Sequence, residues 1–186
     1  MARIKMVEYP ESTGRLKEIY NEIIEKRGKL AEVHKIQSLH PESIVNHMDL
    51  YLEIMFSRSE LSRAEREMMA VIVSVANGCD YCRLHHSEAL NHYWKSDDKI
   101  TMLIKDFNHA GLSQREILLC GFARKLTEKP EIYNDPNSLI DLKNLPLSDS
   151  AILDATLVVA YFNFVNRIVL ALGVESSAEE VQGYRF

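Results

Sequence analysis

Apolar residues recur every three to four positions along most of this chain, which is the period of an amphipathic helix. The pattern predicts helices over residues 12–28, 41–56, 62–76, 79–94, 97–107, 113–127 and 148–172, whereas residues 174–186 have no clear period. No segment alternates convincingly with the two-residue period of a half-buried strand. The sequence therefore predicts an all-α fold of about seven or eight helices in a single domain over residues 1–186.

Three of these helices share a start signal in which a Leu-Ser pair precedes the apolar run. The segments are LSRAE at 61, LSQRE at 112 and LSDSA at 147. In the first two, Ser62 with Glu65 and Ser113 with Glu116 have the spacing of a capping box, in which both side chains satisfy unpaired backbone N–H groups. Ala151 interrupts this pattern in the third segment.

The first and third of these segments also continue alike. When the Leu-Ser pairs at 61 and 147 are superposed, Val73 lies opposite Val159 and Asn77 opposite Asn163. This similarity suggests an internal duplication of a helical unit, whose second copy lacks cysteine and histidine.

Composition and charge narrow the classes of protein. The chain has 186 residues, 46% of them hydrophobic and 26% charged, and a formal net charge of −5. No run of Lys and Arg stands out, so we expect no nucleic-acid partner. The first twenty residues lack the apolar core of a secretory signal, and three cysteines do not make a disulfide framework. We therefore expect a cytoplasmic protein, in a reducing compartment.

Residues 151–173 are long and apolar enough to be mistaken for a membrane span. Asp154, Asn163, Asn166 and Arg167 interrupt this stretch, and charged side chains are costly inside lipid. We expect a helix buried in the protein core or in a subunit interface, and no membrane association.

The most informative stretch is ANGCDYCRLHH at residues 76–86, which contains two of the three cysteines. Asn77-Gly78 is a turn dipeptide between two helical runs, so it predicts the corner of a helical hairpin. In the second helix of this hairpin, Cys79, Cys82 and His86 have i, i+3 and i+7 spacing and share one face.

The hairpin also brings Glu67 into this group. Glu67 precedes Asn77 by ten residues and His86 follows it by nine. At about 1.5 Å of rise per residue, both residues lie roughly 14 Å from the turn and nearly level with each other. A continuous helix through Gly78 would instead separate Glu67 from the cysteines by roughly 18 Å.

This arrangement suits thiol redox chemistry. A helix N-terminus and a nearby imidazole both favour the thiolate, and a carboxylate facing the imidazole orients it. A thiolate that attacks a peroxide becomes a sulfenic acid, which a second thiol one turn away converts to a disulfide. Proximity to the helix terminus favours Cys79 as the first nucleophile, whereas proximity to His86 favours Cys82, and the residues alone leave both open.

Glu67, then eleven residues, then Cys79-x-x-Cys82-x-x-x-His86 resembles the signature of the AhpD-like alkylhydroperoxidases of the carboxymuconolactone decarboxylase superfamily. VSVANGCDYCRLHHSEAL is especially similar to the peroxidase-related branch, and VVAYFNFVNRIVLALGV also resembles it. The likeness extends over about residues 36–175.

The resemblance implies an all-α fold, a homo-oligomer, and reduction of organic hydroperoxides without haem, flavin or metal. It implies Cys82 as the peroxidatic cysteine, Cys79 as the resolving one, and a proton relay of His86 and Glu67. It also implies a thiol reductant, such as a dihydrolipoyl or thioredoxin-like protein. The best-known members have a second histidine where this chain has Tyr81, and tyrosine, with a pKa near 10, does not relay protons near neutrality.

Two other hypotheses use the same residues. A disulfide oxidoreductase or redox sensor would cycle the cysteine pair without meeting peroxide, and an oligomeric module could be held together by zinc bound to Cys79, Cys82, His86 and Glu67. A pair of cysteines buried side by side without function is the remaining alternative.

The remaining candidate residues have structural interpretations. We expect His85 at the polar surface or an interface, Cys120 as an inert core thiol and His47 as a packed core histidine. Tyr161, Phe162 and Phe164 are interpreted as core or subunit contacts. Tyr81 is predicted either to shield the site from water or to donate a hydrogen bond to substrate.

Overall fold

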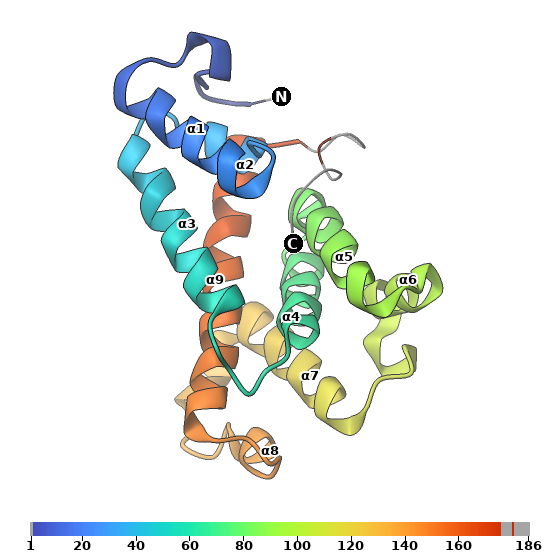
Figure 1. Cartoon of the computed structure of the whole chain (residues 1–186). Helices are drawn as coiled ribbons and strands as arrows, with labels where there is room; N and C mark the ends of the chain where they lie inside the picture. The colour runs from blue at the N-terminus through green and yellow to red at the C-terminus, as the bar shows by residue number, and fades with distance from the viewer. Residues whose placement is uncertain (1, 176–179, 181–186) are drawn as a thin grey trace.

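The structure is a computed structural model that describes residues 2–175 and residue 180. This part of the chain contains nine α-helices and no strand (Figure 1). The helices are α1 (Gly14–Arg27), α2 (Glu32–Lys35), α3 (Pro41–Phe56), α4 (Arg63–Ala76), α5 (Asp80–Trp94), α6 (Asp97–Asp106), α7 (Gln114–Glu128), α8 (Ile140–Lys143) and α9 (Asp149–Leu172). Three 3₁₀ turns lie at Tyr9–Glu11, Phe107–His109 and Pro130–Asn134. The predicted all-α fold is confirmed.

Each of the seven predicted helices is present, with ends that differ by at most two residues from the prediction. The short helices α2 and α8 were not predicted, because four residues are too few to establish a period. Most of the stretch 174–186 lies outside the described residues.

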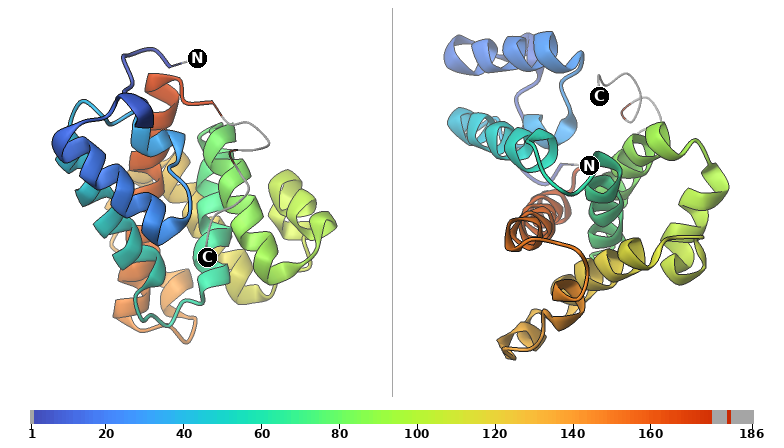
Figure 2. Two further views of the ribbon diagram at one scale, coloured as in Figure 1. Left: turned by 45° about the horizontal axis from the view of Figure 1, so that its top comes forward. Right: turned by 60° about the horizontal axis from the view of Figure 1, so that its bottom comes forward.

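Helix α4 lies at the centre of the fold and is buried on all sides. Every side chain from Arg66 to Ser74 is buried, which is typical of a helix that is surrounded by other elements. Helices α5, α7 and α9 pack against it, α3 contacts both α4 and α9, and α1 packs on α3 (Figures 1 and 2). The main core comes largely from α4, α7 and α9, and a smaller apolar cluster joins α1 to α3.

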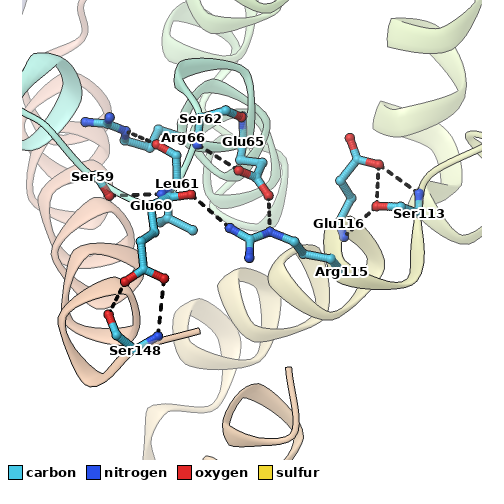
Figure 3. A network of polar contacts seen from close by, with 10 residues as sticks. All are labelled: Ser59, Glu60, Leu61, Ser62, Glu65, Arg66, Ser113, Arg115, Glu116 and Ser148. Carbon is cyan, nitrogen blue, oxygen red and sulfur yellow. Dashed lines mark hydrogen bonds and ion pairs between the residues drawn. The ribbon is translucent and has the colours of Figure 1, made fainter. Parts of the chain in front are cut away.

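The three Leu-Ser segments place three helix N-termini in one region (Figure 3). Both predicted capping boxes are present, at Ser62 of α4 and Ser113 of α7. Ser148 caps α9 by accepting a hydrogen bond from the Ala151 N–H at 3.2 Å, without a second box residue.

Two charged side chains tie these N-termini together. Arg115 of α7 donates to the Glu65 carboxylate at 2.6 Å and to the Glu60 carbonyl at 3.1 Å. The Glu60 carboxylate accepts hydrogen bonds from the hydroxyl and the backbone N–H of Ser148 (Figure 3). The contacts hold α4, α7 and α9 in register at the end opposite the Asn77-Gly78 corner.

Helix α9 has one buried and one exposed apolar side. Within the described residues it alone is long and apolar enough to cross a membrane by length and composition, a test that core helices of soluble proteins also pass. One side packs on α3, α4 and α7. The other exposes apolar side chains, namely Leu153, Leu157 and Phe164. Such a surface suits contact with another protein chain.

The corner between α4 and α5 is built as the sequence predicts. Gly78 has a φ of +64°, in the left-handed region that favours glycine, and Cys79 is the N-cap residue of α5. Asn77 donates from Nδ2 to the side-chain oxygens of Asn163 and Asn166, each at 3.0 Å, which fastens the corner to α9.

Alanine substitutions at two glycines should change stability in opposite directions. A Cβ would meet no atom within 4 Å at either Gly78 or Gly121, so only backbone conformation differs. Gly78→Ala should lower the free energy of unfolding by about 1–2 kcal/mol, because a side chain disfavours the left-handed region. Gly121→Ala, inside α7, should raise it by about 0.5–1 kcal/mol. Denaturant unfolding measures both, and a stabilising Gly78→Ala would contradict the assigned corner.

Candidate functional site

The hairpin places the four predicted site residues on two adjacent helices and at the corner between them. Helix α4 carries Glu67, and α5 carries Cys82 and His86 after the N-cap residue Cys79. The two helices run side by side in opposite directions (Figure 1). His86 Nδ1 lies 2.7 Å from Glu67 Oε2, as the level positions on the two helices predict.

Glu67 is a completely buried carboxylate with two partners. Its Oε1 accepts hydrogen bonds from Arg63 Nε at 2.9 Å and Nη2 at 2.5 Å, and its Oε2 faces His86. Arg63 is itself held by the Met55 carbonyl at 2.9 Å and the Tyr51 hydroxyl at 3.2 Å. Burial acts to raise the pKa of Glu67, but His86 and Arg63 together outweigh it and leave that pKa below its usual value.

An ionised Glu67 fixes the tautomer of His86. A carboxylate accepts hydrogen bonds only, so His86 Nδ1 must carry a proton. The Nε2 atom of the neutral ring then has a free lone pair, and it makes no hydrogen bond within the described part of the chain. The ring packs edge-on against Phe162, with the ring centroids 4.4 Å apart, which holds its orientation.

Cys82 and His86 line the same cavity, of about 100 Å³, between α2, α3, α5 and α9. Most of its wall is apolar or aromatic, and it includes Tyr51, Tyr161, Phe162 and Val165. Three further histidines also line it, namely His34, His47 and His85. The cavity therefore offers a thiol and an imidazole base to a small, mainly apolar ligand.

Both cysteines of the pair are reduced and buried, and their thiols interact. A hydrogen bond from Cys82 lowers the pKa of Cys79, and the same bond, together with burial, raises the pKa of Cys82. Thiol acidity therefore favours Cys79, whereas only Cys82 lines the cavity that contains His86. Cys79 lines a separate cavity at the other side of Tyr81, with Arg3, Asp80 and Glu175.

The hydroxyl of Tyr81 is held by groups of the protein. Its hydroxyl donates to Glu180 Oε1 at 2.9 Å and accepts from the Val33 N–H at 3.3 Å. Tyr81 lines both cavities, and its engaged hydroxyl favours the shielding role over the substrate-binding one.

His85 was expected at the polar surface or an interface; the first alternative is wrong, and the second stays a prediction. Its side chain is 14% exposed, lines the cavity and lies 3.8 Å from Glu180 Oε1. Burial lowers the pKa of His85 to about 3, that of His34 to about 3 and that of His47 to about 4, so all three rings are neutral at pH 7. His47 is buried as predicted, although it also faces the cavity.

The remaining structural interpretations concern Cys120 and the three aromatic residues of α9. Cys120 is fully buried in α7, and burial raises its pKa, as expected for an inert core thiol. Tyr161 and Phe162 are buried at the cavity, whereas Phe164 is 48% exposed.

Sequence reasoning did not identify Arg63 or Asn166 as part of the site. Arg63 lies one turn before Glu67, a spacing that could have indicated the ion pair. Asn166 is fully buried in α9 and its side chain forms a hydrogen bond that lowers the pKa of Cys82. A polar residue in an otherwise apolar helix was the available signal for it.

The described residues do not have the arrangement that the zinc hypothesis requires. Among residues 2–175 and 180, no group of three or more His, Cys, Asp or Glu side chains is arranged to hold a metal ion. Both carboxylate oxygens of Glu67 are engaged by Arg63 and His86.

Glu67→Gln should destabilise the protein, because it leaves the Arg63 charge buried without a counter-charge. Removal of one partner of a buried pair costs about 3 kcal/mol, measured as the free energy of unfolding near pH 7. The folded-state pKa of Glu67 is lowered, so its contribution is present above the unfolded pKa of about 4.3 and is lost as the pH falls through the folded value. The difference in the free energy of unfolding between wild type and Glu67→Gln should therefore become smaller as the pH falls.

Glu128→Gln is the matched control, because Glu128 pairs with Arg124 at 2.9 Å on the exposed surface of α7. It should change stability by at most about 0.5 kcal/mol. Equal losses in the two variants would contradict the special role of the buried carboxylate.

Comparison with known proteins agrees with this geometry. The model of the Carboxymuconolactone decarboxylase family matches residues 44–106, which span the hairpin. A peroxidase-related protein of Silicibacter sp. TM1040 is 26% identical, with a TM-score of 0.83 and 100% of each chain covered. No curated protein matches the chain in sequence.

Two other solved structures share the fold at lower identity. An AhpD-core, peroxidase-related protein of Ralstonia eutropha JMP134 is 22% identical over 97% of this chain and 94% of its own, with a TM-score of 0.85. The debrominase Bmp8 is 18% identical over 97% of this chain and 98% of its own, with a TM-score of 0.78. Together with the motif and the helical fold, these matches show that residues 44–106 resemble the Carboxymuconolactone decarboxylase family and that the chain has the fold of AhpD-like, peroxidase-related proteins.

Proposed function

We propose that this protein is a thiol-dependent peroxidase that reduces organic hydroperoxides. The observation that carries the proposal is the cavity shared by Cys82 and His86, in which Glu67 holds the imidazole with its Nε2 lone pair uncommitted. The similarity to this superfamily supports a peroxidase-related role, and the spacing of the four residues supports this particular chemistry.

In the first step, His86 takes the proton of the Cys82 thiol, and Glu67 stabilises the imidazolium. The Cys82 thiolate attacks the terminal oxygen of the hydroperoxide, so that an S–O bond forms and the O–O bond breaks. The alkoxide that leaves receives the proton held on His86. Cys82 thiol and hydroperoxide thereby become Cys82 sulfenic acid and an alcohol.

In the second step, the Cys79 thiol attacks the sulfenic acid sulfur, and a disulfide and one water are formed. An external dithiol then reduces the disulfide back to two thiols and is itself oxidised. We propose a dihydrolipoyl or thioredoxin-like protein as this donor. The cavity that Cys79 lines lies apart from the hydroperoxide cavity, so a donor thiol and a hydroperoxide need not compete for one entrance.

We choose Cys82 as the first nucleophile because it lines the cavity that contains His86, and not because its thiol is the more acidic of the two. The lowered pKa of Cys79 favours a thiolate there at rest, but Cys79 does not line the cavity of His86. The Cys79 and Cys82 thiols are hydrogen-bonded to each other, so they titrate as a pair.

We further propose a substrate size, a cellular compartment and an oligomeric state for the protein. The cavity of about 100 Å³ suits a small organic group better than a bulky one. The chemistry needs no bound cofactor, no nucleic acid and no membrane, and it suits the reducing cytoplasm. The exposed apolar side of α9, with Leu50 and Phe56 of α3, supports a homo-oligomer.

The test is a count of free thiols before and after one equivalent of tert-butyl hydroperoxide, followed by peptide mapping. Loss of two thiols, mapped to Cys79 and Cys82 with Cys120 intact, is expected. Cys82→Ser should abolish the reaction, whereas Cys79→Ser should leave a sulfenic acid that dimedone traps at Cys82. Cys120→Ser is the control and should react as wild type does.

Other outcomes would assign the protein to another class. Trapping at Cys79 in Cys82→Ser protein would reverse the two roles. Unchanged thiols after peroxide, combined with rapid oxidation by a disulfide, would indicate an oxidoreductase or sensor. Stoichiometric zinc that stabilises the fold would indicate the zinc-bound module.

Leu157→Glu should disrupt the homo-oligomer, because it places a charge on the exposed apolar side of α9, where Leu157 is 40% exposed. Light scattering coupled to size-exclusion chromatography measures the mass of the particle. Glu128→Gln on α7 is the control and should leave that mass unchanged. A wild-type protein that is monomeric at every concentration would contradict the oligomer.

A further inference from the structure

A chain of hydrogen bonds that the mechanism above does not use ends at the cavity. Gln37 Nε2 lies 2.8 Å from His47 Nδ1, and His47 Nε2 lies 2.7 Å from the Tyr161 hydroxyl. His47 and Tyr161 are buried and both line the cavity with Cys82. The direction of these bonds decides which atom offers a proton to a ligand.

The contacts of Gln37 fix the direction of these hydrogen bonds. Its Nε2 also donates to the Val33 carbonyl oxygen at 2.8 Å. In the opposite orientation the amide oxygen of Gln37 would face that carbonyl, and two acceptors would repel each other. Gln37 therefore keeps its NH₂ group at this position and donates its second hydrogen to His47.

His47 then has a single tautomer. Its Nδ1 accepts from Gln37, so the proton of the neutral ring lies on Nε2 and is donated to the Tyr161 oxygen. Burial lowers the pKa of His47 to about 4, so the ring is neutral near pH 7. Tyr161 is consequently an acceptor in its bond with His47, and its own hydrogen is not used there.

The Tyr161 hydrogen has no acceptor among the described residues. Burial raises the pKa of Tyr161 well above its usual value, so the phenol keeps its proton. His34, whose Nδ1 is buried without a hydrogen-bond partner in the described part of the chain, lines the same cavity. Polar groups left unpaired inside an apolar cavity commonly bind the polar part of a ligand.

We propose that Tyr161 is a further catalytic residue, whose hydroxyl donates a hydrogen bond to the leaving oxygen of the hydroperoxide bound beside Cys82. His47 and Gln37 are positioning residues that direct this hydroxyl. The assignment rests on the proposed peroxidase function and adds the group that stabilises the leaving oxygen.

The hydrogen bond from Tyr161 changes no covalent bond and no proton transfer of the oxidation step. As the Cys82 sulfur bonds to the terminal oxygen and the O–O bond breaks, negative charge develops on the alkoxide oxygen. The hydrogen bond from Tyr161 stabilises this charge, in the manner of an oxyanion hole, while the phenol keeps its proton. The alkoxide receives its proton from His86.

The test compares Tyr161→Phe, which removes only the hydroxyl, with Tyr133→Phe as control. Tyr133 packs against Phe122 and does not line the cavity. Two rates are measured at Cys82 by peptide mapping, namely oxidation by tert-butyl hydroperoxide and alkylation by iodoacetamide. Tyr161→Phe should slow the oxidation on the order of 100-fold, because one donor to the developing oxyanion is lost.

Alkylation should keep the wild-type rate in Tyr161→Phe protein, because iodide leaves without help from a hydrogen bond. An unchanged oxidation rate, or equal losses in both reactions, would overturn the assignment. Wild-type protein that resists the hydroperoxide would overturn the peroxidase proposal and the catalytic role of Tyr161 together.

A second measurement does not depend on peroxide turnover. Nitrogen NMR of isotope-labelled histidine, with the signal assigned through a His47→Gln variant, should show Nε2 protonated and Nδ1 unprotonated in His47. A proton on Nδ1 would reverse the chain of bonds and overturn the proposed donor even if the protein is a peroxidase.

Discussion

The site depends on one buried charge, the carboxylate of Glu67. A carboxylate with no exposed surface is stable only with partners, and here Arg63 and His86 take one oxygen each. The same contact joins α4 to α5 and fixes the tautomer of His86, whose ring lines the cavity of Cys82. The stability of the fold and the proposed chemistry therefore depend on the same interaction, and a substitution of Glu67 affects both.

The surrounding fold makes this burial feasible. Helix α4 is covered on all sides, so Glu67 is shielded from water, and the Gly78 corner returns the chain so that His86 comes level with it. The same corner places Cys79 at the start of α5, where the two cysteines line separate cavities. A thiol pair with access from two sides suits a cycle in which oxidant and reductant act in turn.

The parts that could be predicted from sequence are those set by local rules. The helical period, the capping boxes at Ser62 and Ser113, and the Asn77-Gly78 turn all act within a few residues. Even the pairing of Glu67 with His86 follows from counting along a hairpin. The contacts between α3 and α9, such as His47 with Tyr161, join residues 114 positions apart, and no local pattern indicates them. His85 was misplaced for the same reason, because the wall opposite it comes from a distant part of the chain.

The most direct measurement is the rate constant for oxidation of the cysteine pair by an organic hydroperoxide in His86→Gln protein. If Glu67 holds His86 as the base for Cys82, this rate should fall on the order of 100-fold relative to wild type, at unchanged stoichiometry. A rate equal to that of wild type would contradict the role of the Glu67–His86 pair.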